Sequence, residues 1–100
     1  MQKNSKLRTQ TKHMNPILWE KVIRQYLTSK KKLHVLSYQE ISKRLTLVGV
    51  EQSPQNLSAK FNQGKLSAAL FFSTLQAMGE KQIDLRELVQ ILDGLQENAP

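Results

Sequence analysis

The chain has 100 residues, no cysteine and a formal net charge of +7. This length fits one domain with one hydrophobic core, and the lack of cysteine excludes disulfides and thiolate metal sites. The longest apolar run, residues 68–72, has five residues, whereas a membrane span needs roughly 20 and a secretory segment about 7–15. We therefore expect a cytoplasmic protein without a membrane partner.

The charge is unevenly distributed along the chain. Residues 1–65 hold thirteen Lys/Arg and three acids, while residues 66–100 hold two Lys/Arg and five acids. This asymmetry favours one surface for a polyanion such as nucleic acid, although an ordinary solvated basic surface remains the alternative. Residues 1–15, which include Lys12, are basic, polar and nearly free of apolar side chains, so we expect a disordered arm.

Five amphipathic helices are predicted between residues 16 and 96. The first begins at Pro16 and ends in a lysine triplet, residues 30–32, which either terminates the helix or contacts phosphate. The second begins at a Ser37–Glu40 capping box and ends at Gly49. The apolar residues of the first helix recur at i, i+3, i+4 and i+7, and those of the second helix line one face. They are Trp19, Val22, Ile23 and Tyr26, then Tyr38, Ile41, Leu45 and Val48.

Serines precede the next two predicted helices, and a second capping box precedes the last. The third helix follows Ser53, buries Leu57 and Phe61, and ends at Gly64. The fourth runs from Ser67 to Gly79, and the fifth follows Asp84, with Glu87 completing the box. Their predicted core stripes are Ala68, Phe71, Phe72 and Leu75, then Leu85, Leu88, Val89, Leu92 and Leu95.

These elements predict an all-α, compact four- or five-helix bundle containing a helix-turn-helix, with residues 97–100 as a frayed tail. Trp19, Phe71 and Phe72 each lie on an apolar stripe, so we expect them in the core and not stacked on nucleic-acid bases.

The third helix combines two core anchors with a polar remainder. No acid occurs between Gln52 and Gln76, and Gln, Asn, Ser and Lys are side chains that pair with base edges in the major groove. A polar surface helix without a ligand is the alternative. The expected base-contacting residues are Gln52, Gln55, Asn56, Ser58 and Lys60. The expected phosphate-contacting residues are Lys12, Ser37, Gln39, Lys43, Arg44, Ser53, Asn62, Gln63 and Lys65.

Several short stretches carry a resemblance to a known family. They are residues 38–42, 52–53, 59–64, 64–67 and 75–79. Through them, residues 17–79 resemble the lambda-repressor-like (Cro and phage-repressor, XRE-type) helix-turn-helix domain. The last stretches also resemble small uncharacterised bacterial domains with a GK-x-SA…F…L-x-A-x-G pattern. The resemblance implies a third helix in the major groove and a second helix across the backbone. The spacing from Ile41 to Gly49 exceeds the usual pattern by nearly one helical turn.

The sequence therefore predicts a small transcriptional regulator of phage or bacterial type that binds double-stranded DNA sequence-specifically. The alternative is a helical protein–protein adaptor whose basic surface binds an acidic partner. No enzyme, cofactor or small-molecule substrate is expected, because His13 and His34 are isolated and no phosphate loop or nucleophile motif occurs.

The last helix also predicts a homodimer. Leu85, Leu88, Leu92 and Leu95 have the 3-4-3 spacing of a coiled-coil-like seam, and paired helix-turn-helix modules read two half-sites. The same stripe would alternatively close the core of a single chain.

Overall fold

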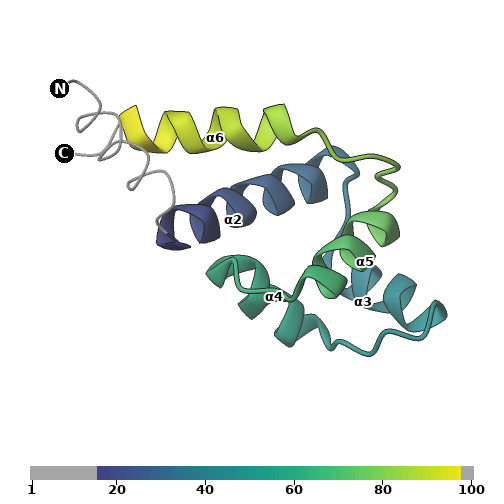
Figure 1. Ribbon diagram of the computed structural model, residues 1–100. Coiled ribbons are helices and arrows are strands. Elements are labelled where there is room, and N and C mark those ends of the chain that lie inside the picture. Colours follow the sequence, from purple (N-terminus) through teal and green to yellow (C-terminus); the bar gives the residue numbers. More distant parts are fainter. Residues whose placement is uncertain (1–15, 98–100) are drawn as a thin grey trace, which may run out of the picture.

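The computed structural model describes residues 16–97, which form five α-helices and no strand (Figure 1). The helices are α2 (Pro16–Leu33), α3 (Tyr38–Leu47), α4 (Pro54–Gln63), α5 (Ala68–Met78) and α6 (Leu85–Glu97). The prediction of an all-α bundle is confirmed for this part of the chain. The predicted arm, with Lys12, lies outside the described residues. Helix α6 continues through Gly94 to Glu97, one residue into the predicted tail.

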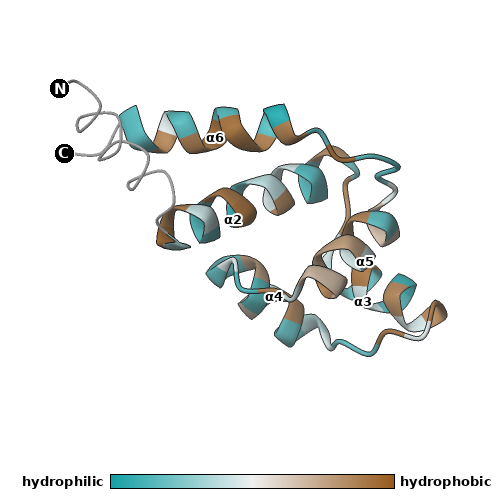
Figure 2. Cartoon of the chain, viewed as in Figure 1, coloured by the Kyte–Doolittle hydropathy of each residue, from teal (hydrophilic) through white to brown (hydrophobic). Residues whose placement is uncertain are grey.

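Helix α2 is the common support of the bundle. Helices α6, α4 and α5 all contact α2, and α6 packs along its length. Helix α3 packs on α4 and α5. Figure 2 shows hydrophobic residues along the side of α6 that faces α2. The buried core draws on all five helices: Val22, Tyr26, Leu27, Ile41, Leu45, Leu57, Phe61, Leu75, Met78, Leu88 and Leu92.

Serine hydroxyls cap the N-termini of three helices, as predicted. Ser37, Ser53 and Ser67 each accept a hydrogen bond of 3.1 Å from the backbone N–H three residues later. These bonds satisfy amides that have no partner within the helix. Three expected start sites are thus confirmed at α3, α4 and α5.

The two glutamates of the predicted capping boxes, Glu40 and Glu87, bind cations instead of the backbone, whereas Asp84 caps α6 as predicted. Glu40 accepts from Arg44 at 3.4 Å, and Glu87 accepts from Lys30 at 3.2 Å. Asp84 accepts from the backbone N–H of Arg86 at 2.9 Å. Hydrogen bonds between charged partners are stronger than those to a neutral amide, so nearby cations compete successfully for these carboxylates.

Five side chains predicted to be in the core are exposed, namely Val48, Ala68, Phe72, Leu85 and Val89. Phe72, Val48 and Leu85 have exposed fractions of 56%, 68% and 64%. The error on α5 has a clear cause, because residues 68–72 are all apolar and the helical period cannot say which face is buried. Packing selects a different face of α5, which consists of Leu70, Thr74, Leu75 and Met78. Val48 lies beyond the end of α3, where the extra residues noted in the sequence extend past the core.

Gly64 lets α4 end directly against α2. Its backbone is left-handed, with φ at +66°, and a Cβ atom there would collide with the backbone carbonyl of Glu20. Gly49, at the end of α3, also has positive φ, but a Cβ atom there would meet open space. Only at Gly64 does the absence of a side chain also set the distance between two helices.

The turn after α2 contains a strained residue. Val35 has φ at +54° and an exposed fraction of 88%. Its N–H donates to Lys32 O at 3.1 Å, and Leu36 N–H donates to Lys31 O at 3.0 Å. This bonding pattern normally has glycine at the left-handed position, because a β-branched side chain is unfavourable there. The bonds of the turn thus hold Val35 in a costly conformation.

Gly64→Ala should destabilise the fold far more than Gly49→Ala. Both substitutions place Cβ on a left-handed residue, which costs roughly 1–2 kcal/mol. Only Gly64→Ala also forces α4 away from α2, so we expect a total loss on the order of 3 kcal/mol. Urea unfolding followed by circular dichroism measures both. Equal losses for the two variants would contradict the close approach of α4 to α2.

Val35→Gly should stabilise the protein by about 1 kcal/mol, because glycine adopts the left-handed conformation freely and no buried contact is lost. Val48→Gly is the matched control. Val48 is also an exposed valine at a helix end, but its φ is −105°, so glycine there should cost about 0.5–1 kcal/mol through backbone entropy. Thermal unfolding decides, and a lower melting temperature for Val35→Gly would refute the strain at this turn.

Candidate functional site

Helix α4 is fixed through one face. Leu57 and Phe61 are fully buried, and the Phe61 ring meets Tyr38 of α3 edge-on at a centroid distance of 5.2 Å. Edge-to-face contacts of this kind stabilise a pair beyond its burial alone. Pro54 at the first turn and left-handed Gly64 after the last turn define the two ends. The helix is therefore held rigidly while its other face remains open.

The open face of α4 is made of amides around one small residue. Its exposed members are Gln55, Asn56, Ala59, Asn62 and Gln63. No acid occurs in the sequence between Gln52 and Gly79. Such a face offers hydrogen-bond donors and acceptors without negative charge, and its centre permits close approach.

The structure separates the predicted base-contacting residues into two groups. Gln55 and Asn56 are exposed, and Ser58 and Lys60 are half-buried at the edges of the open face. Gln52 differs. Its backbone carbonyl accepts from the Ser42 hydroxyl at 2.6 Å, and its Oε1 is buried with no hydrogen-bond partner among the described residues. Gln52 thus belongs to the turn between α3 and α4.

Ala59 was missed by sequence reasoning, although it lies four residues after Gln55 and four before Gln63 on the same helical face. The signal was present in the spacing. Alanine carries no hydrogen-bonding group, however, and its high helix propensity makes it an ordinary filler residue. Only its exposure in the folded chain marks it as part of the open face.

The predicted phosphate-contacting residues are also divided. Gln39 and Lys43 are exposed one turn apart on α3, and Lys65 is exposed directly after α4, beside Asn62 and Gln63. The hydroxyls of Ser37 and Ser53 cap their own helices.

Arg44 has a packing role that the sequence did not reveal. Its Nη1 donates to the backbone carbonyl of Ala77 at 3.1 Å, and its Nε donates to Glu40 at 3.4 Å. The guanidinium thereby joins α3 to the last turn of α5, where helix carbonyls have no partner within the helix. The Nε and Nη1 donors of Arg44 are therefore already used in hydrogen bonds within the fold.

An ionic cluster connects the end of α2 to α6. Lys30 Nζ lies 3.2 Å from Glu87 and 3.6 Å from Glu80, and His34 Nε2 lies 2.6 Å from the second oxygen of Glu80. The hydrogen bond with His34 is the main cause that lowers the pKa of the Glu80 carboxyl, with a further contribution from Lys30. Glu80 therefore remains an anion to lower pH than an ordinary glutamate.

The lysine triplet at the end of α2 is therefore not uniform. Lys30 belongs to the ionic cluster, and Lys31 lies over the Tyr38 ring with its Nζ 4.6 Å from the ring centroid. Lys32 is exposed. Only one member of the triplet is thus left fully open to solvent.

The leucine stripe of α6 is largely used within the chain. Leu88 and Leu92 are buried in the core and Leu95 packs against it, whereas Leu85 is exposed. This is the arrangement expected where the stripe closes the core of a single chain. The homodimer stays a prediction.

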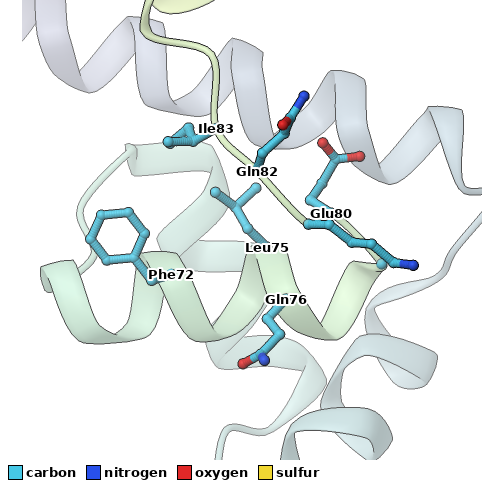
Figure 3. A pocket seen from close by; sticks show the side chains of 8 residues that line it. Phe72, Leu75, Gln76, Glu80, Gln82 and Ile83 are labelled. Carbon is cyan, nitrogen blue, oxygen red and sulfur yellow. The ribbon is translucent and has the colours of Figure 1, made fainter.

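A pocket lies between α5 and the loop that leads to α6 (Figure 3). Phe72, Leu75 and Ile83 form its apolar lining, and Figure 3 shows Leu75 to the right of the other two. Glu80, Lys81, Gln76, Gln82 and Gly79 complete the lining. None of these residues is a serine, cysteine or histidine. Among residues 16–97, no group of three potential metal ligands is present, and no helix has the length and apolarity to span a bilayer.

Comparison with known proteins places the chain in one family. No curated protein and no solved structure matches it. A family model described as a domain of unknown function matches residues 19–83, which comprise most of α2, all of α3 to α5 and the loop before α6. The match covers more than half of the chain, so this protein belongs to the family named Domain of unknown function (DUF6471).

Proposed function

We propose that this protein binds double-stranded DNA sequence-specifically, as a small transcriptional regulator, with α4 in the major groove. The observation that carries this proposal is the open face of α4, where exposed amides surround Ala59 on a helix whose other face is buried. The major groove admits an α-helix, and its base edges present the donors and acceptors that amides match.

The open face of α4 and two neighbouring lysines would have different roles in this function. Gln55 and Asn56, near the start of α4, would pair with adenine, and Ala59 would contact a thymine methyl group. Lys43 on α3 and Lys65 after α4 would contact the phosphates on either side, which fix position without reading sequence. The rigid seat of α4 supports this assignment, because precise base contacts require a fixed helix.

A second candidate is a protein–protein adaptor, and the pocket in Figure 3 favours it. Phe72 and Ile83 are large apolar side chains that remain exposed at its rim. Exposed apolar groups at a concave site are typical of protein contacts. This surface and the open face of α4 are built from different residues, so the two functions can be separated by mutation.

Binding to duplex DNA should depend strongly on salt. If about five to eight phosphates are neutralised, a plot of log K against log salt concentration should have a slope of about −4 to −7. Fluorescence anisotropy with a random-sequence 30-base-pair duplex between 50 and 250 mM NaCl measures this slope. Phe72→Ala should leave it unchanged. A slope near zero for the wild-type protein would eliminate the DNA proposal and leave the adaptor.

Substitutions on α4 should separate sequence reading from general affinity. Gln55→Ala and Asn56→Ala should each cost about 1–3 kcal/mol on the best duplex selected from a random pool, with little effect on random DNA. Lys65→Ala should weaken binding to both, because phosphates are the same in every sequence. Gln90→Ala, an exposed amide on α6, is the control and should change neither. If all the α4 variants bind both duplexes as the wild type does, α4 is not the reading helix.

A further inference from the structure

A basic stripe runs along the outer face of α2, opposite the residues that build the core. Lys21, Arg24, Thr28 and Lys32 follow one another at intervals of three, four and four residues, which is the spacing of one helical face. The three cations are exposed, and Thr28 is half-buried between them. The stripe was not predicted from the sequence, in which the core residues of this helix and the lysine triplet at its end form the more obvious patterns.

The stripe is continuous with the open face of α4. Arg24, Thr28 and Lys32 line one groove together with Asn62. Lys21 and Arg24 line a second groove with Asn62 and Gln63. The last turn of α4 therefore borders the basic side of α2, and a ligand lying along α4 would reach both helices.

The cations of the stripe have no acidic partners within the described residues. The ion pairs of this part of the chain involve Lys30, His34, Arg44 and Arg86, and none involves Lys21, Arg24 or Lys32. The one carboxylate that lines either groove belongs to Glu20, which is half-buried. Three unpaired cations on one face create a local positive potential that attracts a polyanion.

The length of the stripe distinguishes a polymer from a single anion. Lys32 lies eleven positions after Lys21, which corresponds to about 16 Å along an α-helix at 1.5 Å per residue. Successive phosphates of one strand of B-DNA rise about 3.4 Å along the duplex axis, so the stripe is as long as the axial rise of roughly five of them. A free phosphate ion would occupy only a small part of this surface.

We propose that the α2 stripe (Lys21, Arg24, Thr28 and Lys32) is a contact surface for the phosphate backbone of the strand that borders the groove occupied by α4. This inference rests on the proposed DNA-binding function and adds a helix to it. The stripe supplies affinity and orientation, whereas α4 reads the bases. It also gives Lys21, Arg24 and Lys32 a role different from that of Lys30 and Lys31, which contact other residues of the fold.

The test compares two double variants of the full chain with equal loss of charge. Lys21→Gln/Arg24→Gln removes two cations of the stripe, and Lys81→Gln/Arg86→Gln removes two exposed cations from the loop before α6 and its first turn. The probe is the random-sequence 30-base-pair duplex, titrated at several NaCl concentrations. In the stripe variant, the slope of log K against log salt concentration should be less negative by about 1.8, because each of the two lost phosphate contacts contributes about 0.9. Its affinity at 100 mM NaCl should fall on the order of tenfold, while the control should change less than about twofold.

The outcomes separate the inference from the function on which it rests. If the wild-type protein does not bind the duplex, both proposals fail. If it binds and both double variants weaken equally, net charge alone is responsible and the stripe is not a contact surface, although DNA binding stands. A stripe variant that binds as the wild type does leads to the same conclusion.

A second experiment uses poly-glutamate of matched charge in place of the duplex. Tighter binding of this polymer than of the duplex would assign the stripe to an acidic protein. Thermal unfolding should give nearly the same melting temperature for both variants, because the substituted side chains are exposed and the Arg86–Asp84 pair is a surface ion pair, which contributes little to stability.

Discussion

The arrangement of the bundle depends on the close approach of α4 to α2 at Gly64. The backbone of this residue lies against the Glu20 carbonyl, where no side chain fits. The left-handed conformation of Gly64 also ends α4 and turns the chain toward α5. One residue thus terminates a helix, fixes its distance from the central helix and directs the next one. The buried Phe61, about one turn earlier, attaches α4 to α3 as well through its contact with Tyr38.

This attachment decides which residues remain available to a partner. Because the inner face of α4 is fixed by Leu57 and Phe61, its amides are held outward with little freedom of the backbone. The same approach brings Asn62 and Gln63 beside the basic side of α2. A surface formed by two helices is larger and better defined than one helix alone, and this geometry supports the proposed use of α4 and α2 on one ligand. The matched family region includes both helices and excludes α6.

Electrostatics divides the cations of the chain into two classes. Some are used inside the fold, where Lys30 holds Glu80 and Glu87, and Arg44 joins α3 to the end of α5. Others remain exposed along α2, α3 and the turn after α4, without an acidic partner among the described residues. The first class stabilises the bundle through partly buried charge-assisted bonds, which salt screens weakly. The second class is exposed to solvent and is therefore available to an external polyanion. Net charge alone cannot distinguish the classes.

Local sequence was sufficient to predict the five helices and most of their ends. Serine caps, Pro54 and the glycines at 49, 64 and 79 act through local hydrogen bonds and backbone angles, so neighbouring residues suffice to predict them. It also predicted the amide-rich character of α4 from composition. Tertiary structure alone decided which face of α5 is buried, because five consecutive apolar residues give no periodicity, and left Phe72 exposed. It likewise decided that the Gln52 side chain is buried and that Arg44 binds a carbonyl 33 residues away. It also decided that the basic face of α2 meets the end of α4. Contacts between distant segments depend on how the helices pack, so the local sequence pattern does not predict them.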